Sequence, residues 1–522
     1  MKSVSKVDKP ILWSSLIISA AFVVATLVTP SGVSKVFNEI FSFFTKNLGW
    51  AYMLSAAVFV TFCIGLAVSK YGNIKLGKDD EEPEHSRGSW FAMLFAAGMG
   101  IGLVFWGVAE PIMHFNYSPF ADSKTPEAAS IAMRTVLFHW GLHPWAMYAV
   151  VALALAYFQF CKGLPGLISS TLYPLIGEKG IRGPIGKIID AIAVIVTLFG
   201  VATSLGLGAQ QLTSGMNFEY GLPNTTTVAV VLIAIITVLF IISAVTGIDK
   251  GIKFLSNTNM VIAFLLMLFL LIVGPTRYIL NIFSESIGDY LQNIVSLSFF
   301  MDTQGTVAKH TGYDWIGSWT VFYWAWWITW APFVGSFIAR ISKGRTIREF
   351  MVGILVAPTL LSAIWFSIVG GSALNIELFS SGGIGAAVDK DVPSGIFAML
   401  SHFPLSSLMV VLTMILLAIF FITSADSATF VVGMFTSGGE LNPDNRLKIV
   451  WGVVEGSLAA ILLVAGGLSA VQTVSFMFSF PFMIIMILMV VSLVKAMGKG
   501  KKNTNCDLKQ SHESNVEGVR NE

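Results

Sequence analysis

The stretch FAAGMGIGLVFWGVAEP, residues 95–111, decides the fold class of this chain. It is apolar, yet Gly98, Gly100 and Gly102 interrupt it at alternate positions. Each glycine costs a helix interior about 1 kcal/mol relative to alanine, so this spacing favours a local break. Inside a membrane, a broken helix is tolerated only where it is buried or lines a cavity. The segment therefore predicts either the substrate and ion site of a secondary transporter or close helix packing through small residues.

The composition of the whole chain places this segment in a membrane protein. Of the 522 residues, 55% are hydrophobic and 12% are charged, whereas soluble domains carry roughly 25% charged residues. The 32 basic and 30 acidic residues leave a net charge of only +2, so neither a disordered chain nor a nucleic-acid-binding protein is expected. This length predicts an all-α polytopic membrane protein with roughly ten to thirteen spans.

Twelve apolar stretches are long enough to cross a bilayer. They centre on residues 12–30, 49–69, 89–113, 130–160, 188–212, 225–247, 254–276, 315–339, 349–370, 404–435, 447–467 and 470–495. Lysine and arginine collect before the first span and after every second one. This pattern predicts a multi-pass protein of the cell membrane with both termini in the cytoplasm.

Residues 277–300, RYILNIFSESIGDYLQNIVSLSFF, have apolar side chains recurring every three or four residues. The period predicts an amphipathic helix on the outer membrane surface. Such a helix either couples the two halves of the protein or is a packed interfacial helix without a mechanistic role.

Two spans concentrate aromatic residues. HWGLHPWAMY (139–148) and VFYWAWWITWAPF (321–333) each place several aromatic side chains on an arc of roughly 140°, whereas Trp324 points the other way. Pro144 predicts a kink. Tryptophan normally lies in belts at the membrane interfaces, but the second segment has four tryptophans within seven residues. A cage of indole faces is what a quaternary ammonium requires. The residues on these arcs are Trp140, Trp145, Tyr148, Phe322, Trp326, Trp327, Trp330 and Phe333.

The tenth span contains FFITSADSATF, residues 420–430. Backbone carbonyls and the hydroxyls of Thr423 and Ser424 are oxygen ligands suited to a small cation, although such hydroxyls also serve as ordinary hydrogen bonders between helices. Asp426 is costly inside a membrane, and we expect it to form a gate or a structural pair with Arg340 or another basic residue.

Other polar residues of the spans receive structural interpretations. Glu110 and Arg134 are expected to form pairs of the same kind as Asp426. His139 and His143 are expected to be hydrogen bonders rather than proton relays. No HExxH motif or similar cluster points to an enzyme, and no organic cofactor is expected.

Four segments together resemble the betaine/choline/carnitine transporter family: GMGIGLVFWGVAEP (98–111), HWGLHPWAMYA (139–149), YWAWWITWAPFVGSFIARISKGRTIREF (323–350) and FFITSADS (420–427). The chain looks most like its sodium-coupled glycine betaine carriers from Gram-positive bacteria. The resemblance implies a leucine-transporter-like fold of twelve helices, with two inverted repeats of five, two extra N-terminal helices and a homotrimeric assembly. The implied division is 1–88 for the tail and two peripheral helices, 89–276 for the first repeat, 277–300 for the surface helix, 301–497 for the second repeat and 498–522 for a cytoplasmic tail.

The same resemblance implies roles for single residues. Trp140, Trp145, Tyr148 and Trp327 look like the cage for trimethylammonium, and Gly98, Met99 and Gly100 would receive the carboxylate. Trp326 and Trp330 look like a transient site toward the cytoplasm, with Phe322 as an aromatic gate. One sodium site would use Ala96, Met99, Phe420, Thr423 and Ser424, and a second would use Thr203, Ser204 and Phe333.

Two details favour sodium-coupled uptake of betaine within the family. Proton-coupled choline carriers have an acidic residue in the glycine stretch, where this chain has Gly102, and sodium-independent carnitine exchangers lack the oxygen ligands that Thr423 and Ser424 supply here. The expected mechanism is symport by alternating access. A sodium-independent exchanger or a choline or carnitine carrier of the same fold is the alternative. Regulation by osmolality or by anionic membrane lipid is weakly indicated, because only Lys499, Lys501 and Lys502 cluster in the tail.

Overall fold

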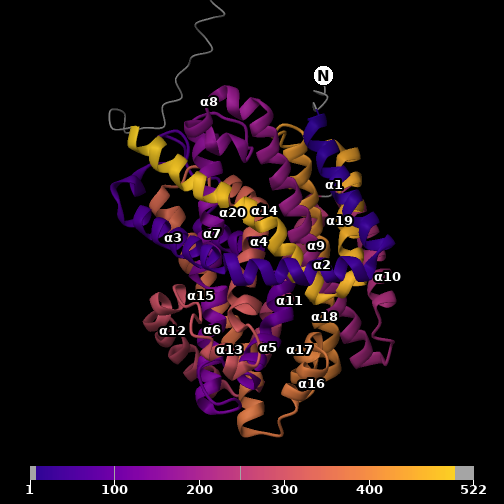
Figure 1. Ribbon diagram of the computed structural model, residues 1–522. Helices are drawn as coiled ribbons and strands as arrows, with labels where there is room; N and C mark the ends of the chain where they lie inside the picture. The colour runs from indigo at the N-terminus through magenta and orange to yellow at the C-terminus, as the bar shows by residue number, and fades with distance from the viewer. Residues whose placement is uncertain (1–6, 99, 247–248, 500–522) are drawn as a thin grey trace, which may run out of the picture.

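A computed structural model describes residues 7–98, 100–246 and 249–499 of the chain. Every regular element in this described part is a helix (Figure 1). The first half contains α1 (Lys9–Val28), α2 (Pro30–Phe43), α3 (Gly49–Val68), α4 (Arg87–Gly98), α5 (Ile101–Asn116), α6 (Pro126–Trp140), α7 (Leu142–Ala156), α8 (Tyr173–Arg182), α9 (Pro184–Tyr220), α10 (Thr226–Thr246) and α11 (Asp249–Val273).

The second half begins with α12 (Thr276–Ser298) and the short α13 (Thr306–Thr311). It continues with α14 (Phe322–Ile341), α15 (Ile347–Phe379), α16 (Ile384–Lys390), α17 (Gly395–Leu400), α18 (Ser406–Thr436), α19 (Asn445–Gly466) and α20 (Leu468–Lys499). Each of the twelve predicted apolar stretches overlaps one or two of these helices.

Within the described residues, ten helical segments are long and apolar enough to cross a membrane. The broken pair α4 and α5 and the tryptophan-rich α14 are not among the ten. The outward faces of α10 and α11 carry exposed apolar side chains such as Val238 and Phe254, as expected of helices that face lipid. The all-helical, polytopic architecture predicted from the sequence is therefore confirmed.

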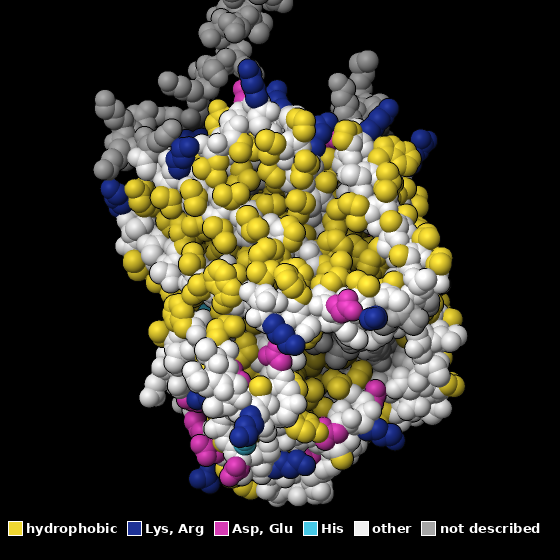
Figure 2. Space-filling model, in the orientation of Figure 1, with side chains coloured by type: hydrophobic (Ala, Val, Ile, Leu, Met, Phe, Trp, Pro, Cys, Tyr) yellow, Lys and Arg dark blue, Asp and Glu magenta, His cyan; other side chains and the backbone are white. Residues whose placement is uncertain are grey.

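The predicted basic loops lie together at one end of the bundle. Residues 74–76, after the second predicted span, exchange backbone hydrogen bonds with residues 344–347, after the eighth. The Asp8 amide donates to the carbonyl of Thr436, and the Asp8 carboxylate lies 3.5 Å from Lys187 Nζ. Figure 2 shows lysine and arginine side chains along this upper end and hydrophobic side chains across the middle of the visible face.

Helix α9 runs through the centre of the molecule over 37 residues. It begins with Pro184, whose missing N–H costs nothing in the first turn. It ends at Tyr220 and is capped by Gly221, which takes the left-handed conformation at φ 67° that glycine adopts without strain. This helix packs against α5, α14, α18, α19 and α20, so it forms the core around which the candidate site is arranged.

The predicted amphipathic helix corresponds to α12. It packs on α6 and α15, one helix from each half of the chain. Its buried side includes Ile279, Ile282 and Tyr290, while Leu280 and Leu291 are exposed. The sequence period therefore predicted the correct element, with its start one residue and its end two residues later than in the structure.

Candidate functional site

The glycine segment breaks a helix, as predicted. Helix α4 ends at Gly98 and α5 begins at Ile101, with the intervening Gly100 at φ −146° and ψ −139°. Met99 lies outside the described residues, and so does the side chain of Ala96; of Gly98, only its place at the end of α4 is described. Their predicted roles therefore remain predictions.

Gly102 lies directly against the aromatic residues. A methyl group added to it would stand 2.8 Å from Trp326 Cη2 and 3.1 Å from Trp140 Cη2. Any side chain at this position would displace both indoles, so the bare backbone of α5 forms part of the wall of the aromatic cluster.

The helix that carries the first aromatic group is also broken. Gly141, at φ −95° and ψ −129°, separates α6 from α7. Pro144 stands in the first turn of α7 and cannot donate to the carbonyl four residues earlier. At the same break, the carbonyl of His139 accepts from Trp327 Nε1 at 3.0 Å, and the Leu142 amide donates to Tyr290 Oη at 3.0 Å. Side chains from α14 and α12 thus satisfy backbone groups that the break leaves free.

The four predicted cage residues come together at this break. The rings of Trp140 and Trp327 lie 4.8 Å apart at 76°, those of Tyr148 and Trp327 lie 6.3 Å apart, and those of Trp145 and Tyr148 lie 5.6 Å apart. All four side chains are at most 4% exposed. Tyr148 Oη has no hydrogen-bond partner within the part of the chain that the structure describes. The predicted arcs therefore converge on one buried aromatic cluster.

The other predicted aromatic residues extend this cluster along α14. Trp326 stacks on Trp327 at 4.9 Å and 14°, and on Phe322 at 5.8 Å and 12°. Trp330 lies further along the helix toward the basic end, where its Nε1 donates to the carbonyl of Gly200 at 2.9 Å. Trp330 thus faces α9, while Phe322 and Trp326 continue the stack away from Trp327.

The oxygen ligands predicted in the tenth span lie opposite the glycine break. A methyl group added at Gly100 would stand 3.4 Å from Ser424 Oγ, which brings α18 next to the start of α5. Thr423 Oγ1 donates to the carbonyl of Ile419 at 2.9 Å and lies 3.3 Å from that of Phe420. Backbone and hydroxyl oxygens of the type that coordinate a hard cation are therefore gathered beside the break.

The residues of the predicted second cation site are buried in the core. Thr203 and Ser204 lie in α9, and neither hydroxyl has a hydrogen-bond partner among the described residues. Phe333 lies in α14, which packs against α9, and is 4% exposed. Unpartnered hydroxyls inside a membrane core carry a cost, and a bound cation would remove it.

The charged residues meet partners that the sequence did not fully anticipate. Asp426 is 6% exposed, and no ion pair links it to a lysine or arginine in the described part of the chain. The expected partner Arg340 is instead exposed, with its guanidinium 5.6 Å from the ring centre of Phe430, one turn along α18. Arg134 does form the expected structural pair, with its Nη1 3.5 Å from Asp289 Oδ1 on α12.

The two histidines act as the predicted hydrogen bonders. His143 Nε2 bonds Ser298 Oγ on α12 at 2.9 Å, and its ring stacks on Trp324 at 5.0 Å. His139 Nδ1 bonds Glu110 Oε1 at 2.7 Å, and its Nε2 bonds Thr320 Oγ1 at 2.9 Å. Each histidine therefore joins two segments of the bundle.

Glu110 is the site residue that the sequence reasoning underestimated. It is fully buried in α5 and accepts from Trp140 Nε1, a cage indole, at 2.7 Å. One carboxylate oxygen of Glu110 and one ring nitrogen from each of His114 and His139 lie within 4.8 Å of one another. This spacing would allow all three atoms to bind one metal ion. The argument applied to Asp426, that an intramembrane carboxylate is functional by default, would have identified Glu110 as well.

Comparison with known proteins places this site in a family. Residues 10–502 match the family described as BCCT, betaine/carnitine/choline family transporter. The chain is 52% identical over 493 residues to the glycine betaine transporter OpuD of Bacillus subtilis, covering 94% of this chain and 95% of that one. It is 46% identical over 497 residues to a probable glycine betaine transporter of Desulfitobacterium hafniense, covering 95% and 98%.

A third relative is named for a different solute. The ectoine/hydroxyectoine transporter of Virgibacillus pantothenticus is 40% identical over 505 residues, covering 96% of this chain and 99% of that one. These matches extend over nearly the whole length of every chain compared. The chain therefore belongs to the betaine/carnitine/choline family and is a multi-pass membrane transporter, not an enzyme.

Proposed function

We propose that this protein takes up glycine betaine, or a related quaternary ammonium osmolyte, together with sodium. The observation that carries the proposal is the buried cluster of Trp140, Trp145, Tyr148 and Trp327 beside two broken helices. A trimethylammonium group has no N–H to donate, so ring faces bind it better than hydrogen-bond acceptors do. Two relatives named as glycine betaine transporters, at 52% and 46% identity, support the same substrate.

The carboxylate of the substrate would bind at the glycine break. Backbone N–H groups at the start of a half-helix favour negative charge, and α5 starts at Ile101, immediately after Gly98, Met99 and Gly100. One sodium ion would bind between Ala96, Met99, Phe420, Thr423 and Ser424. A second would use Phe333 of α14 and the hydroxyls of Thr203 and Ser204 in α9, which have no hydrogen-bond partner among the described residues.

Sodium gives the transport its direction. Betaine is a zwitterion, so the membrane potential alone does not draw it into the cell. Each sodium ion that enters with it contributes about 2.3 kcal/mol per 100 mV. Two ions therefore contribute about 4.6 kcal/mol, enough for an accumulation ratio above a thousandfold. Coupling would arise because sodium orders the glycine break against α18, which raises substrate affinity and permits alternating access.

The proposed architecture has twelve spans, with α4–α5 and α14 as the two beyond the ten that length and composition identify. Two five-helix inverted repeats would rock around the site, with both termini in the cytoplasm and three copies forming the assembly. The gathering of basic loops at one end of the bundle supports this orientation.

The test is uptake of labelled glycine betaine into empty proteoliposomes with an inward sodium gradient, against a potassium control. Wild-type protein should accumulate betaine only with sodium, and Trp327→Leu should abolish accumulation. Activity confined to vesicles preloaded with substrate would instead identify an exchanger. The relative named for ectoine makes that solute the second candidate, and competition by unlabelled ectoine, choline and carnitine would rank the substrates.

A further inference from the structure

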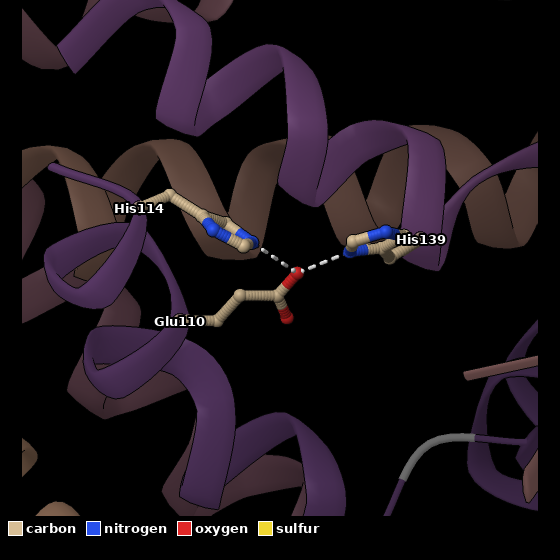
Figure 3. A group of neighbouring side chains, drawn as sticks. All are labelled: Glu110, His114 and His139. Carbon is tan, nitrogen blue, oxygen red and sulfur yellow. Dashed lines mark hydrogen bonds and ion pairs between the residues drawn. The ribbon is translucent and has the colours of Figure 1, made fainter. Parts of the chain in front are cut away.

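Glu110 lies at the centre of a buried polar cluster behind the aromatic cage. Figure 3 shows the rings of His114 and His139 directed at the same oxygen of its carboxylate. That oxygen, Oε1, is 2.7 Å from His139 Nδ1 and 3.5 Å from His114 Nε2. All three side chains are completely buried.

The second carboxylate oxygen faces the cage. Oε2 accepts hydrogen bonds from Trp140 Nε1 at 2.7 Å and from Tyr323 Oη. Tyr323 belongs to α14 and its ring lies 5.8 Å from that of Trp327 at 24°. Glu110 therefore joins α5 to α6 and α14, the helices that carry two of the four cage rings.

The pattern of donors fits an ionised carboxylate. An indole N–H only donates, so Trp140 requires an acceptor at Oε2. Trp315 Nε1 lies 3.4 Å from His114 Nδ1, which makes that nitrogen an acceptor and leaves the proton of a neutral ring on Nε2, facing Glu110. An ionised Oε1 can only accept, so His139 Nδ1 donates to it, while His139 Nε2 lies 2.9 Å from the hydroxyl of Thr320, which can donate or accept.

When both histidine rings are neutral, the cluster carries one net negative charge, on the carboxylate of Glu110. No lysine or arginine in the described part of the chain forms an ion pair with Glu110, whose ion-pair partners there are His114 and His139. A buried negative charge without a cation is expensive. The carboxylate of Glu110 contacts the indole of Trp140, and the proposed substrate would place its positive charge against the face of that indole.

We propose that Glu110 is a positioning residue that makes the cage selective for a cationic head group. Its carboxylate fixes the Trp140 indole through the N–H. It also adds a fixed negative charge at the N–H edge of the ring, which strengthens the attraction of the ring face for a cation. This inference rests on the proposed function, because it takes the cage to bind trimethylammonium.

The test compares glycine betaine with its carbon isostere 3,3-dimethylbutyrate, which has the same shape and carboxylate but no positive charge. Binding of both to purified full-length protein in detergent is measured by tryptophan fluorescence, in sodium. Glu110→Gln should weaken betaine binding about tenfold and leave the affinity for the isostere unchanged or improved. A merely structural role would weaken both ligands equally, and an unchanged ratio of the two affinities would overturn the proposal.

Glu455→Gln is the matched control. Glu455 is also fully buried, in α19, where it accepts from Thr429 Oγ1 at 3.0 Å outside this cluster. Glu455→Gln should leave the ratio of the affinities for betaine and its isostere at the wild-type value. A loss of betaine preference in this variant similar to that in Glu110→Gln would refute a specific effect of Glu110.

A second variant keeps the test decisive if Glu110→Gln does not fold. Tyr323→Phe removes the hydroxyl that donates to Glu110 Oε2 but keeps the carboxylate charge. The preference for betaine over its isostere should therefore be at least that of wild type, and a tenfold lower preference would overturn the proposal. Failure of the wild type to bind betaine would instead contradict the proposed function itself.

Discussion

The glycine at position 102 offers a direct test of how tightly the backbone of α5 packs on the cage. Gly102→Ala adds one methyl group at 2.8 Å from Trp326 Cη2 and 3.1 Å from Trp140 Cη2. Carbon atoms pack best at about 3.5–4.0 Å, so the two indole tips must retreat by about 0.5–1 Å. Trp140 is held by Glu110 and Trp326 is stacked between Phe322 and Trp327.

The cost of this overpacking follows from how little the rings can move. Extra methylenes in a well-packed core cost about 1–3 kcal/mol. If the strain is relieved by displacing the cage rings, substrate affinity carries that cost and falls about 5- to 150-fold. The helix itself gains from the replacement, because alanine favours helix over glycine by about 1 kcal/mol.

The assay is the concentration of betaine that gives half-maximal uptake, together with the dissociation constant from tryptophan fluorescence. Gly65→Ala is the matched control, since that glycine lies in α3 with nothing within 4 Å of an added methyl group. The control should behave as wild type. Wild-type affinity in Gly102→Ala would refute the view that α5 forms a wall of the site.

Three further outcomes are expected. Thr423→Ala combined with Ser424→Ala should raise the sodium concentration needed for half-maximal uptake, and an unchanged sodium dependence would remove α18 from the cation site. Tyr290→Phe leaves the Leu142 amide without its acceptor, which should lower stability by about 1–3 kcal/mol; an unchanged melting temperature in detergent would contradict the bracing of the α6–α7 break. The hydrogen bond from Lys343 holds the pKa of Glu81 below its ordinary value, so this pair stabilises the fold at neutral pH and the stabilisation is lost as the pH falls through that lowered pKa. The melting temperature of Glu81→Gln should therefore be lower than that of wild type at pH 7 and equal to it at acidic pH. A melting temperature lowered by the same amount at both pH values would refute the ionic explanation.

The sequence was sufficient for features that depend on local pattern. Runs of apolar residues located the helices, the glycines located the break between α4 and α5, and helical spacing showed which aromatic residues share a face. These signals require only the neighbours of a residue along the chain. The period of residues 277–300 similarly predicted α12, although a pattern alone did not reveal which helices it covers.

Features that depend on packing between distant segments were not predictable in the same way. Glu110 meets residues 139, 140 and 323, and no spacing rule connects these positions. Asp426 and Arg340 have opposite charges near one end of the bundle, yet the guanidinium rests on Phe430. Charge complementarity suggests a pair, but the directions of the side chains decide whether it forms.

The two helix breaks adjoin different polar side chains among the described residues, and this difference bears on mechanism. At the α6–α7 break, Trp327 Nε1 bonds the carbonyl of His139 and Tyr290 Oη bonds the amide of Leu142. Protein side chains therefore hold this break, together with the cage that it carries, in one arrangement. At the α4–α5 break, a methyl group added at Gly100 would stand 3.4 Å from Ser424 Oγ, in the proposed sodium site. If sodium and substrate supply the missing contacts at the α4–α5 break, their binding orders the start of α5. The cage is already held by Trp327 and Tyr290, so the conformational entropy lost on binding comes mainly from the segment where sodium binds.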